Sequence, residues 1–142
     1  MGQQQLLLII LGVIIVGIAV AVGITMFQDN ALSANKDAVS NDLVQLAAKA
    51  QQFFRKPTAL GGGSNSFSGI STEISNLVSS AFYNNDNGGY TIIANDGTTV
   101  SFLGVGKTQD SDGKYPSVIY TVTPTTFGIN GTWGVASATL TF

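Results

Sequence analysis

Histidine and cysteine are missing from the 142-residue chain, and Glu73 is its one glutamate. Without histidine the chain lacks the commonest general base, and without cysteine it lacks the thiol nucleophile. The same two absences remove the softer ligands of zinc and copper. A scaffold held together by disulfides is also excluded. We therefore expect no enzymatic activity, no catalytic residues, no cofactor and no metal centre.

Charged residues are scarce as well. Six Lys and Arg and eight Asp and Glu make up 10% of the chain, whereas a soluble globular domain has about 25%. The net charge of -2 gives no overall attraction to phosphate backbones, so nucleic acid is not expected as the main ligand. Much of the protein must therefore contact something other than water.

The apolar residues are concentrated at the N-terminal end. Residues 1–28 carry no charge, and Leu6–Phe27 reads LLLIILGVIIVGIAVAVGITMF. As a helix this segment spans about 33 Å, enough to cross a hydrocarbon core of about 30 Å. A secretory signal peptide has a basic start, a shorter apolar stretch and a cleavage site of small residues. We therefore expect the segment to remain in the mature protein and to insert in a membrane.

The helix is expected to continue past the apolar segment, to about residue 56. Glycine and proline are absent between Ile24 and Pro57, and an apolar stripe at helical spacing runs along this stretch. Asp42 is expected on one of the polar faces beside the stripe. Pro57 and the glycines that follow it end the helix. The stripe consists of Val39, Leu43, Leu46, Ala50 and Phe53.

The rest of the chain is expected to form a connection and a small sheet. A short helix is expected within the connection, at Ser71–Phe82. From residue 90, β-branched and aromatic runs alternate with turn residues, which predicts an antiparallel meander of about four strands. The expected strands are Tyr90–Ala94, Thr98–Gly104, Ser117–Thr123 and Thr132–Phe142.

Together these patterns predict an α+β fold, in which a long N-terminal helix packs on a small antiparallel β-meander. A sheet of this size without disulfides buries too little area alone, so we expect the apolar stripe to cover it. The expected units are a hydrophobic helix (1–27), its amphipathic continuation (28–56), a Gly- and Ser-rich connection (57–89) and a sheet (90–142).

Small residues are expected to permit close packing in two places. On the last expected strand, Gly134, Ala136 and Ala138 form a face that a helix can approach closely. Within the apolar segment, small residues four apart allow helices to contact one another closely. The candidates for this helix packing are Gly12, Gly17, Ala21 and Gly23.

A protruding apolar helix, its amphipathic continuation, a connecting loop and an antiparallel sheet resemble the type IV pilins and pilin-like filament subunits. The resemblance covers the whole chain in architecture and about the first 55 residues in pattern. It implies a homopolymer, an extracellular filament assembled from membrane-inserted precursors by a pilus-type machinery. Two alternatives stay open: a single-span membrane protein that displays a small β-rich binding domain without polymerising, and a minor pseudopilin of a secretion system.

The N-terminal residues allow two interpretations within this resemblance. In the family a peptidase cleaves after a glycine that precedes the hydrophobic segment, and the fifth mature residue is usually a glutamate. Cleavage after Gly2 makes Gln3 the new N-terminus. Alternatively, Met1 is the first mature residue and Gln5 occupies the place of the glutamate, where it can hydrogen-bond a neighbour's amine without neutralising it. The run GQQQLLLIILGVIIVGIAVAVGI also resembles archaeal class III signal segments.

Two short motifs are expected to be loops instead of ligand sites. Gly106–Thr108 matches the end of a phosphate-binding P-loop, but Ser101 replaces the first glycine and no helix is expected to follow. Asp110 and Asp112 resemble part of a calcium loop that lacks its other oxygen ligands and its closing glutamate.

Two further features of the sequence each allow two interpretations. Asp29 and Lys36 are the first charges after the apolar segment and lie seven residues apart on nearly one helical face. They mark either a solvated membrane boundary or an ion pair between subunits. Asn130 begins an Asn-Gly-Thr sequon for N-glycosylation, and Asn-Gly is equally typical of a hairpin turn.

Overall fold

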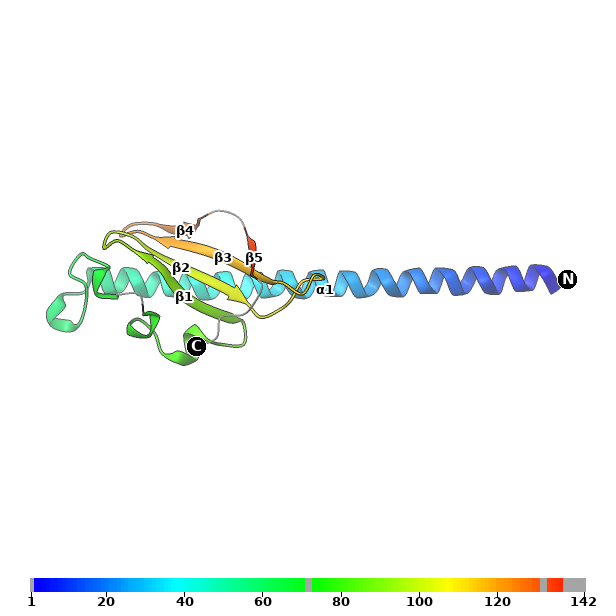
Figure 1. Ribbon diagram of the computed structural model, residues 1–142, viewed down its shortest axis with the longest axis horizontal. Helices are drawn as coiled ribbons and strands as arrows, with labels where there is room; N and C mark the ends of the chain where they lie inside the picture. Colours follow the sequence, from blue (N-terminus) through cyan, green and yellow to red (C-terminus); the bar gives the residue numbers. More distant parts are fainter. Residues whose placement is uncertain (1, 71–72, 131–132, 137–142) are drawn as a thin grey trace.

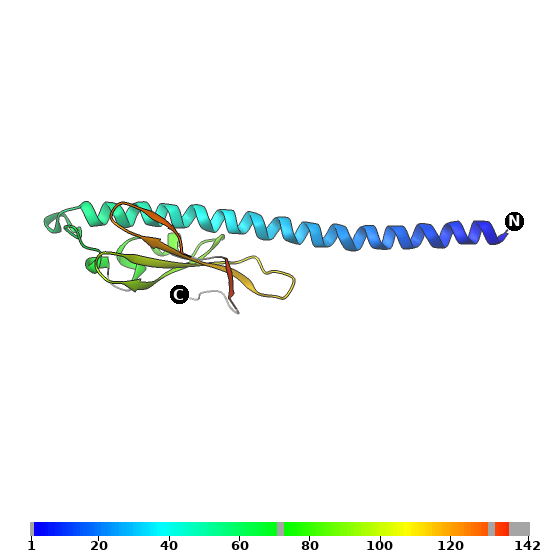
Figure 2. The same ribbon diagram turned by 90° about the horizontal axis from the view of Figure 1, so that it is seen from above.

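The computed structural model describes residues 2–70, 73–130 and 133–136 (Figures 1 and 2). One helix, α1 (Gly2–Arg55), runs for 54 residues. Its first half projects alone, and its second half lies against the sheet. The expected α+β fold is confirmed, because the chain pairs a long N-terminal helix with an antiparallel meander.

The connection after the helix supplies hydrogen-bond donors to the C-terminal end of α1. The last carbonyls of a helix have no intrahelical donor. Here loop amides supply the donors: Gly63 N–H donates to the Phe53 carbonyl at 2.8 Å, and Ser64 N–H donates to the Lys56 carbonyl at 2.9 Å. The loop is therefore attached to the helix end by its backbone.

The prediction of one continuous helix at Ser71–Phe82 was wrong. The described part of this stretch holds a 3-10 turn, η3 (Ile74–Asn76), and a separate short helix, α2 (Ser80–Tyr83). Ser79 breaks the run because it takes an extended conformation at the N-cap position of α2, where its side chain makes no capping hydrogen bond. Two other 3-10 turns lie earlier in the connection, η1 (Thr58–Leu60) and η2 (Ser68–Ile70).

The sheet has the order β1-β2-β3-β4 with antiparallel neighbours, and β5 pairs with β3. Strand β4 follows Pro124 and was not predicted, because Phe127–Ile129 is short and has glycine at its centre. Of the expected strand Thr132–Phe142, only three residues are strand in the described part, and residues 137–142 lie outside it. The strands are β1 (Gly88–Asn95), β2 (Val100–Gly106), β3 (Tyr115–Val122), β4 (Phe127–Ile129) and β5 (Gly134–Ala136).

The core lies between the sheet and the second half of α1. Alternate residues of β2 and β3 point toward the helix, as the period of two in a strand requires. The apolar stripe of α1 covers them, and four residues of the connection complete the core. Its members include Val39, Leu43, Leu46, Ala47 and Ala50 from α1, Phe67, Ile70, Ile74 and Val78 from the connection, and Tyr90, Ile92, Val100, Phe102, Val118, Tyr120 and Val122 from the sheet.

The apolar side chains of the helix approach the sheet closely at Gly104 in β2. A methyl group there would lie 3.0 Å from Leu43 Cδ1 and 3.0 Å from Val39 Cγ1. Gly134, Ala136 and Ala138 were expected to form the face that the helix approaches. This was wrong for Gly134, because a methyl group placed there would have only Ser117 atoms within 4 Å. Gly134 belongs to β5 at the edge of the sheet, while α1 crosses β2 and β3. Ala138 lies outside the described residues.

We expect Gly104→Ala to lower the free energy of unfolding by about 1–3 kcal/mol, because overpacking moves Val39 and Leu43 out of their places. Thermal unfolding of the full chain in detergent micelles, followed by the fluorescence of Trp133, measures this change. Gly128→Ala is the matched control, since the position is also in the sheet and has open space around it. Equal stability of the two variants would contradict the close contact at Gly104.

The turn between β1 and β2 is organised by Asp96. Its Oδ1 accepts hydrogen bonds from Thr99 N–H at 2.6 Å and from both the N–H and the hydroxyl of Thr98 at 2.9 Å. The Thr99 N–H, followed by the two Thr98 donors, lowers the pKa of Asp96 to about 2. Gly97 completes the turn at a φ of 86°, where a side chain would be strained.

The Asp96 carboxylate is therefore expected to support the turn above its unfolded pKa of about 3.9 and to lose that effect as pH falls through about 2. An NMR titration of the carboxyl carbon measures this pKa directly. Thr98→Ala should raise it, because the hydroxyl donor is lost. A wild-type Asp96 pKa near 3.9 would show that these hydrogen bonds do not form in solution.

Candidate functional site

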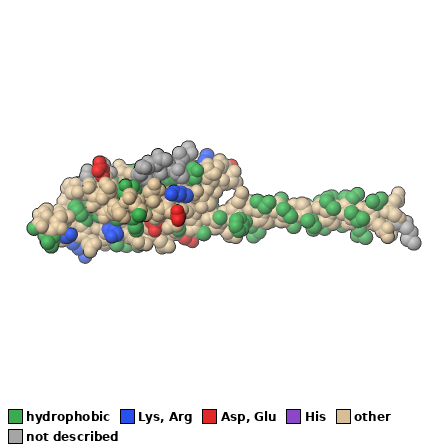
Figure 3. Space-filling view, turned by 90° about the horizontal axis from the view of Figure 1, so that it is seen from below, with side chains coloured by type: hydrophobic (Ala, Val, Ile, Leu, Met, Phe, Trp, Pro, Cys, Tyr) green, Lys and Arg blue, Asp and Glu red, His purple; other side chains and the backbone are tan. Residues whose placement is uncertain are grey.

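The uncovered first half of α1 is the main candidate for a functional surface. The large apolar side chains of Leu6–Phe27 have exposed fractions between 52% and 75%. Figure 3 shows this half as a bare rod with hydrophobic side chains along it. Within the described residues, α1 is the single helix long and apolar enough to cross a membrane, and none of its most apolar window is buried.

The predicted packing residues of this segment are open to a partner. Gly12, Gly17 and Gly23 have no atom within 4 Å of the place where a Cβ would be. Thr25 is the one hydroxyl-bearing side chain of the segment, and it donates to the Ala21 carbonyl at 3.0 Å. The segment therefore presents an apolar surface with small gaps where another helix can approach closely.

The candidate processing residues Gly2, Gln3 and Gln5 lie in the first turn of α1, and all three are exposed. The first four N–H groups of a helix lack intrahelical acceptors. No acidic side chain lies in this turn to complement them. Met1 lies outside the described residues.

Asp29 and Lys36 are not brought together within the chain. Asp29 is exposed on α1. Lys36 is half-buried, and its Nζ lies 5.7 Å from the centroid of the Trp133 ring, a cation–π contact. Trp133 was not among the predicted site residues, because it lies far from Lys36 in the sequence. Lys36 thus contacts its own head, and its pairing with another subunit stays a prediction.

Asp42 was expected on a polar face of the helix, and the structure corrects this. Asp42 is buried, with an exposed fraction of 7%. Its Oδ2 accepts hydrogen bonds from the Tyr90 hydroxyl at 2.7 Å, from Asn85 Nδ2 at 2.9 Å and from Asn87 Nδ2 at 3.0 Å. Burial, together with the hydrogen bond to Asp42 and its negative charge, raises the pKa of Tyr90 well above the usual value. Asp42 and its three donors form the Asp42 cluster.

A signal for the Asp42 cluster was present in the sequence. Asp42 lies three residues after Val39 and four before Leu46, so its spacing places it on the buried stripe. Two other polar side chains of α1 also hydrogen-bond to the head. Asn35 Nδ2 donates to the Asn87 carbonyl at 2.7 Å, and Gln51 Nε2 donates to the Thr123 carbonyl at 3.1 Å. Three polar side chains of α1 therefore fix the head to the helix along its length.

The stripe residues Val39, Leu43, Leu46 and Ala50 are fully buried, and Phe53 is half-buried against the same core. Together with the Asp42 cluster, these residues pack one face of the second half of α1 against its own sheet. The first half, by contrast, has its large apolar side chains uncovered.

The other sequence motifs lie at the end of β2 and in the loop that follows it. Asn35 Oδ1 occupies the space beside Gly106, and Thr108 N–H donates to the same oxygen at 3.4 Å, so this loop packs on α1. Asp110 Oδ1 accepts from the N–H groups of Asp112 and Lys114 at 2.9 Å, which makes a turn. In the part of the chain that the structure describes, no three His, Cys, Asp or Glu side chains are grouped to hold a metal ion.

Asn130 is exposed, and its N–H donates to the Ile119 carbonyl at 2.8 Å at the end of β4. Its side chain is therefore accessible, as glycosylation requires. Gly131 and Thr132, the rest of the sequon, lie outside the described residues, so glycosylation stays a prediction.

Comparisons with protein-family models, with curated proteins and with solved structures find no match. The structure itself has a pilin-like architecture, because a long N-terminal apolar helix packs by its second half on an antiparallel sheet. The exposed apolar half of that helix indicates membrane association or secretion.

Proposed function

We propose that the chain is a structural subunit that assembles through its N-terminal helix into an extracellular, type IV pilus-like filament. Before assembly the subunit would be held in the membrane by the same segment. A pilus-type machinery would extract it, and the filament would carry the sheet on its outer surface.

The observation that carries this proposal is the contrast between the two halves of α1. Sixteen large apolar side chains between Leu6 and Phe27 are exposed, and each gains about 1.5 kcal/mol or more from full burial. Such a segment is unstable in water on its own, so it needs either lipid or protein around it. A bundle of identical helices supplies that cover outside a membrane, and Gly12, Gly17 and Gly23 allow the helices to come close.

The attachment of the head to the helix also supports the proposal. In a filament, the position of each head is set by the helix beneath it, so the head must not rotate on that helix. Asn35, Asp42 and Gln51 fix the head to α1 at three successive places.

Electron microscopy of material sheared from cells that make the protein tests the proposal. We expect filaments that react with antibodies to the head, and the protein as their main component. Recovery of the protein only from detergent-solubilised membranes would overturn the proposal and favour the non-polymerising membrane protein. Filaments that contain the protein only as a trace component would indicate a minor pseudopilin.

A further inference from the structure

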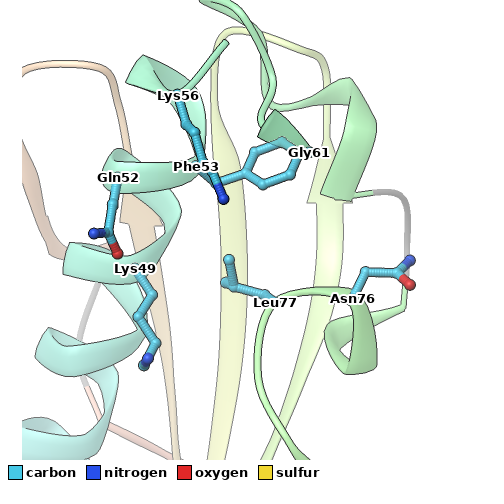
Figure 4. A pocket seen from close by; sticks show the side chains of 7 residues that line it. All are labelled: Lys49, Gln52, Phe53, Lys56, Gly61, Asn76 and Leu77. Carbon is cyan, nitrogen blue, oxygen red and sulfur yellow. The ribbon is translucent and has the colours of Figure 1, made fainter. Parts of the chain in front are cut away.

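A pocket of about 280 Å³ lies at the far end of the head, between the last turns of α1 and the segment around η3 (Figure 4). It takes no part in the surface proposed for assembly. Its volume is close to the lower end of the range of small-molecule sites, about 300–1,000 Å³. Its lining combines two cations, two amides and two apolar side chains: Lys49, Lys56, Gln52, Asn76, Phe53 and Leu77.

The aromatic wall of the pocket is held in place by two glycines of the connection. A methyl group at Gly63 would lie 2.8 Å from Phe53 Cε1, and one at Gly69 would lie 2.9 Å from Phe53 Cζ. The ring also packs against the core. Phe53 therefore keeps its position without a ligand and presents its exposed part to the pocket.

The two lysines have no carboxylate partner. Lys49 on α1 and Lys56 just after its end are exposed, and neither forms an ion pair within the part of the chain described here. Figure 3 shows Lys and Arg side chains at this end of the head. In a chain with only six basic residues and a net charge of -2, two unpaired cations around one pocket favour an anionic ligand.

The amides add hydrogen-bonding groups beside the cations. Asn76 Nδ2 donates to the Ile70 carbonyl at 3.3 Å, which orients the amide and leaves its oxygen as an acceptor. Gln52 lies on α1 between the two lysines and is exposed. An amide both donates and accepts, so these two side chains suit a ligand that carries several hydroxyl groups.

We propose that this pocket binds an acidic sugar, a pyranose ring that carries a carboxylate, as in a uronic acid polysaccharide. Lys49 and Lys56 bind the carboxylate through charge-assisted hydrogen bonds. Gln52 and Asn76 bind the ring hydroxyls, and the apolar face of the sugar packs on Phe53 and Leu77. The site goes beyond the proposed function and does not depend on polymerisation. In a filament the same site repeated on every subunit adds avidity for a polymeric ligand.

Calorimetric titration of the full chain in detergent micelles with trigalacturonate tests this proposal. We expect saturable 1:1 binding that neutral maltotriose does not reproduce. The double variant Lys49→Ala/Lys56→Ala should weaken binding by about 10-fold or more, the loss of at least one charge-assisted hydrogen bond. Gln52→Ala and Asn76→Ala should each weaken it less, without changing the fold.

Arg55→Ala is the matched control, because Arg55 lies in the last turn of α1 and does not line this pocket. It should change the affinity by less than about 2-fold, an effect of screened surface charge alone. An equal loss from Arg55→Ala, or equal competition by sulfate, would show that only general electrostatic attraction is at work and would overturn the sugar site. Absence of binding by the wild-type chain would overturn it as well.

Discussion

Gly17→Asp is expected to abolish filaments while the head stays folded. Gly17 lies near the middle of the apolar segment and has open space around it. A carboxylate at the centre of a membrane helix costs about 2.5–3.5 kcal/mol on insertion, and its burial among apolar helices leaves a charge without a partner. In a filament the defect recurs in every subunit, so its effect on assembly multiplies along the polymer.

Filament yield in sheared material, measured by electron microscopy and immunoblotting, checks this expectation. Gly128→Asp is the matched control: the same substitution is made at another glycine with open space, in strand β4 of the head. It should leave the filament yield near that of the wild type. Normal yield from Gly17→Asp would contradict the assignment of Leu6–Phe27 to the filament core.

Asp42→Ala is expected to lower the free energy of unfolding of the head by about 1–3 kcal/mol, the cost of leaving a buried neutral donor without its acceptor. The substitution leaves the Tyr90 hydroxyl and the Asn85 and Asn87 amides without their shared acceptor. Unsatisfied buried donors cost more than the hydrogen bonds themselves contribute. Denaturant unfolding of the full chain in micelles, followed by Trp133 fluorescence, measures the loss.

Two further variants separate the role of the Asp42 cluster from a general effect of charge. Asp37→Ala removes the same charge from an exposed position on the same helix, and its effect should stay within about 0.5 kcal/mol. Asp42→Asn should fall between wild type and Asp42→Ala, because its amide oxygen still accepts while its nitrogen faces other donors. A loss below about 1 kcal/mol in Asp42→Ala would contradict the cluster as a major attachment of head to helix.

The long helix and its buried stripe could be predicted because both depend on local pattern. A long stretch without proline predicts a continuous helix. Apolar residues spaced three and four apart predict which face of that helix the sheet covers. Three of the strands were placed within a few residues, since alternating β-branched runs are bounded by turn residues.

Features that depend on tertiary contact were missed or misplaced. Asp42 was predicted on a polar face because a carboxylate is rarely buried without a partner, and its three donors lie 43–48 residues away in the sequence. Strand β4 was missed because a three-residue strand with a central glycine carries little local signal. Gly104 was missed as a point of close approach because the strand that α1 crosses cannot be deduced from periodicity.

The uncovered half of α1 and the attachment of the head to its second half have different roles in the proposed filament. In the proposed filament the uncovered apolar half would drive assembly, and the polar contacts of Asn35, Asp42 and Gln51 would hold each head in a fixed position on the second half of α1. Loss of the first should prevent filaments from forming. Loss of the second should yield filaments with irregular outer surfaces, or unfolded heads that fail to assemble.

A cryo-electron microscopy reconstruction of sheared filaments tests the central claim most directly. We predict a core of bundled helices formed by Leu6–Phe27, with the sheet outside and the Asp42 cluster intact between them. A filament in which this segment lies at the outer surface, or one built from a different protein, would contradict the account.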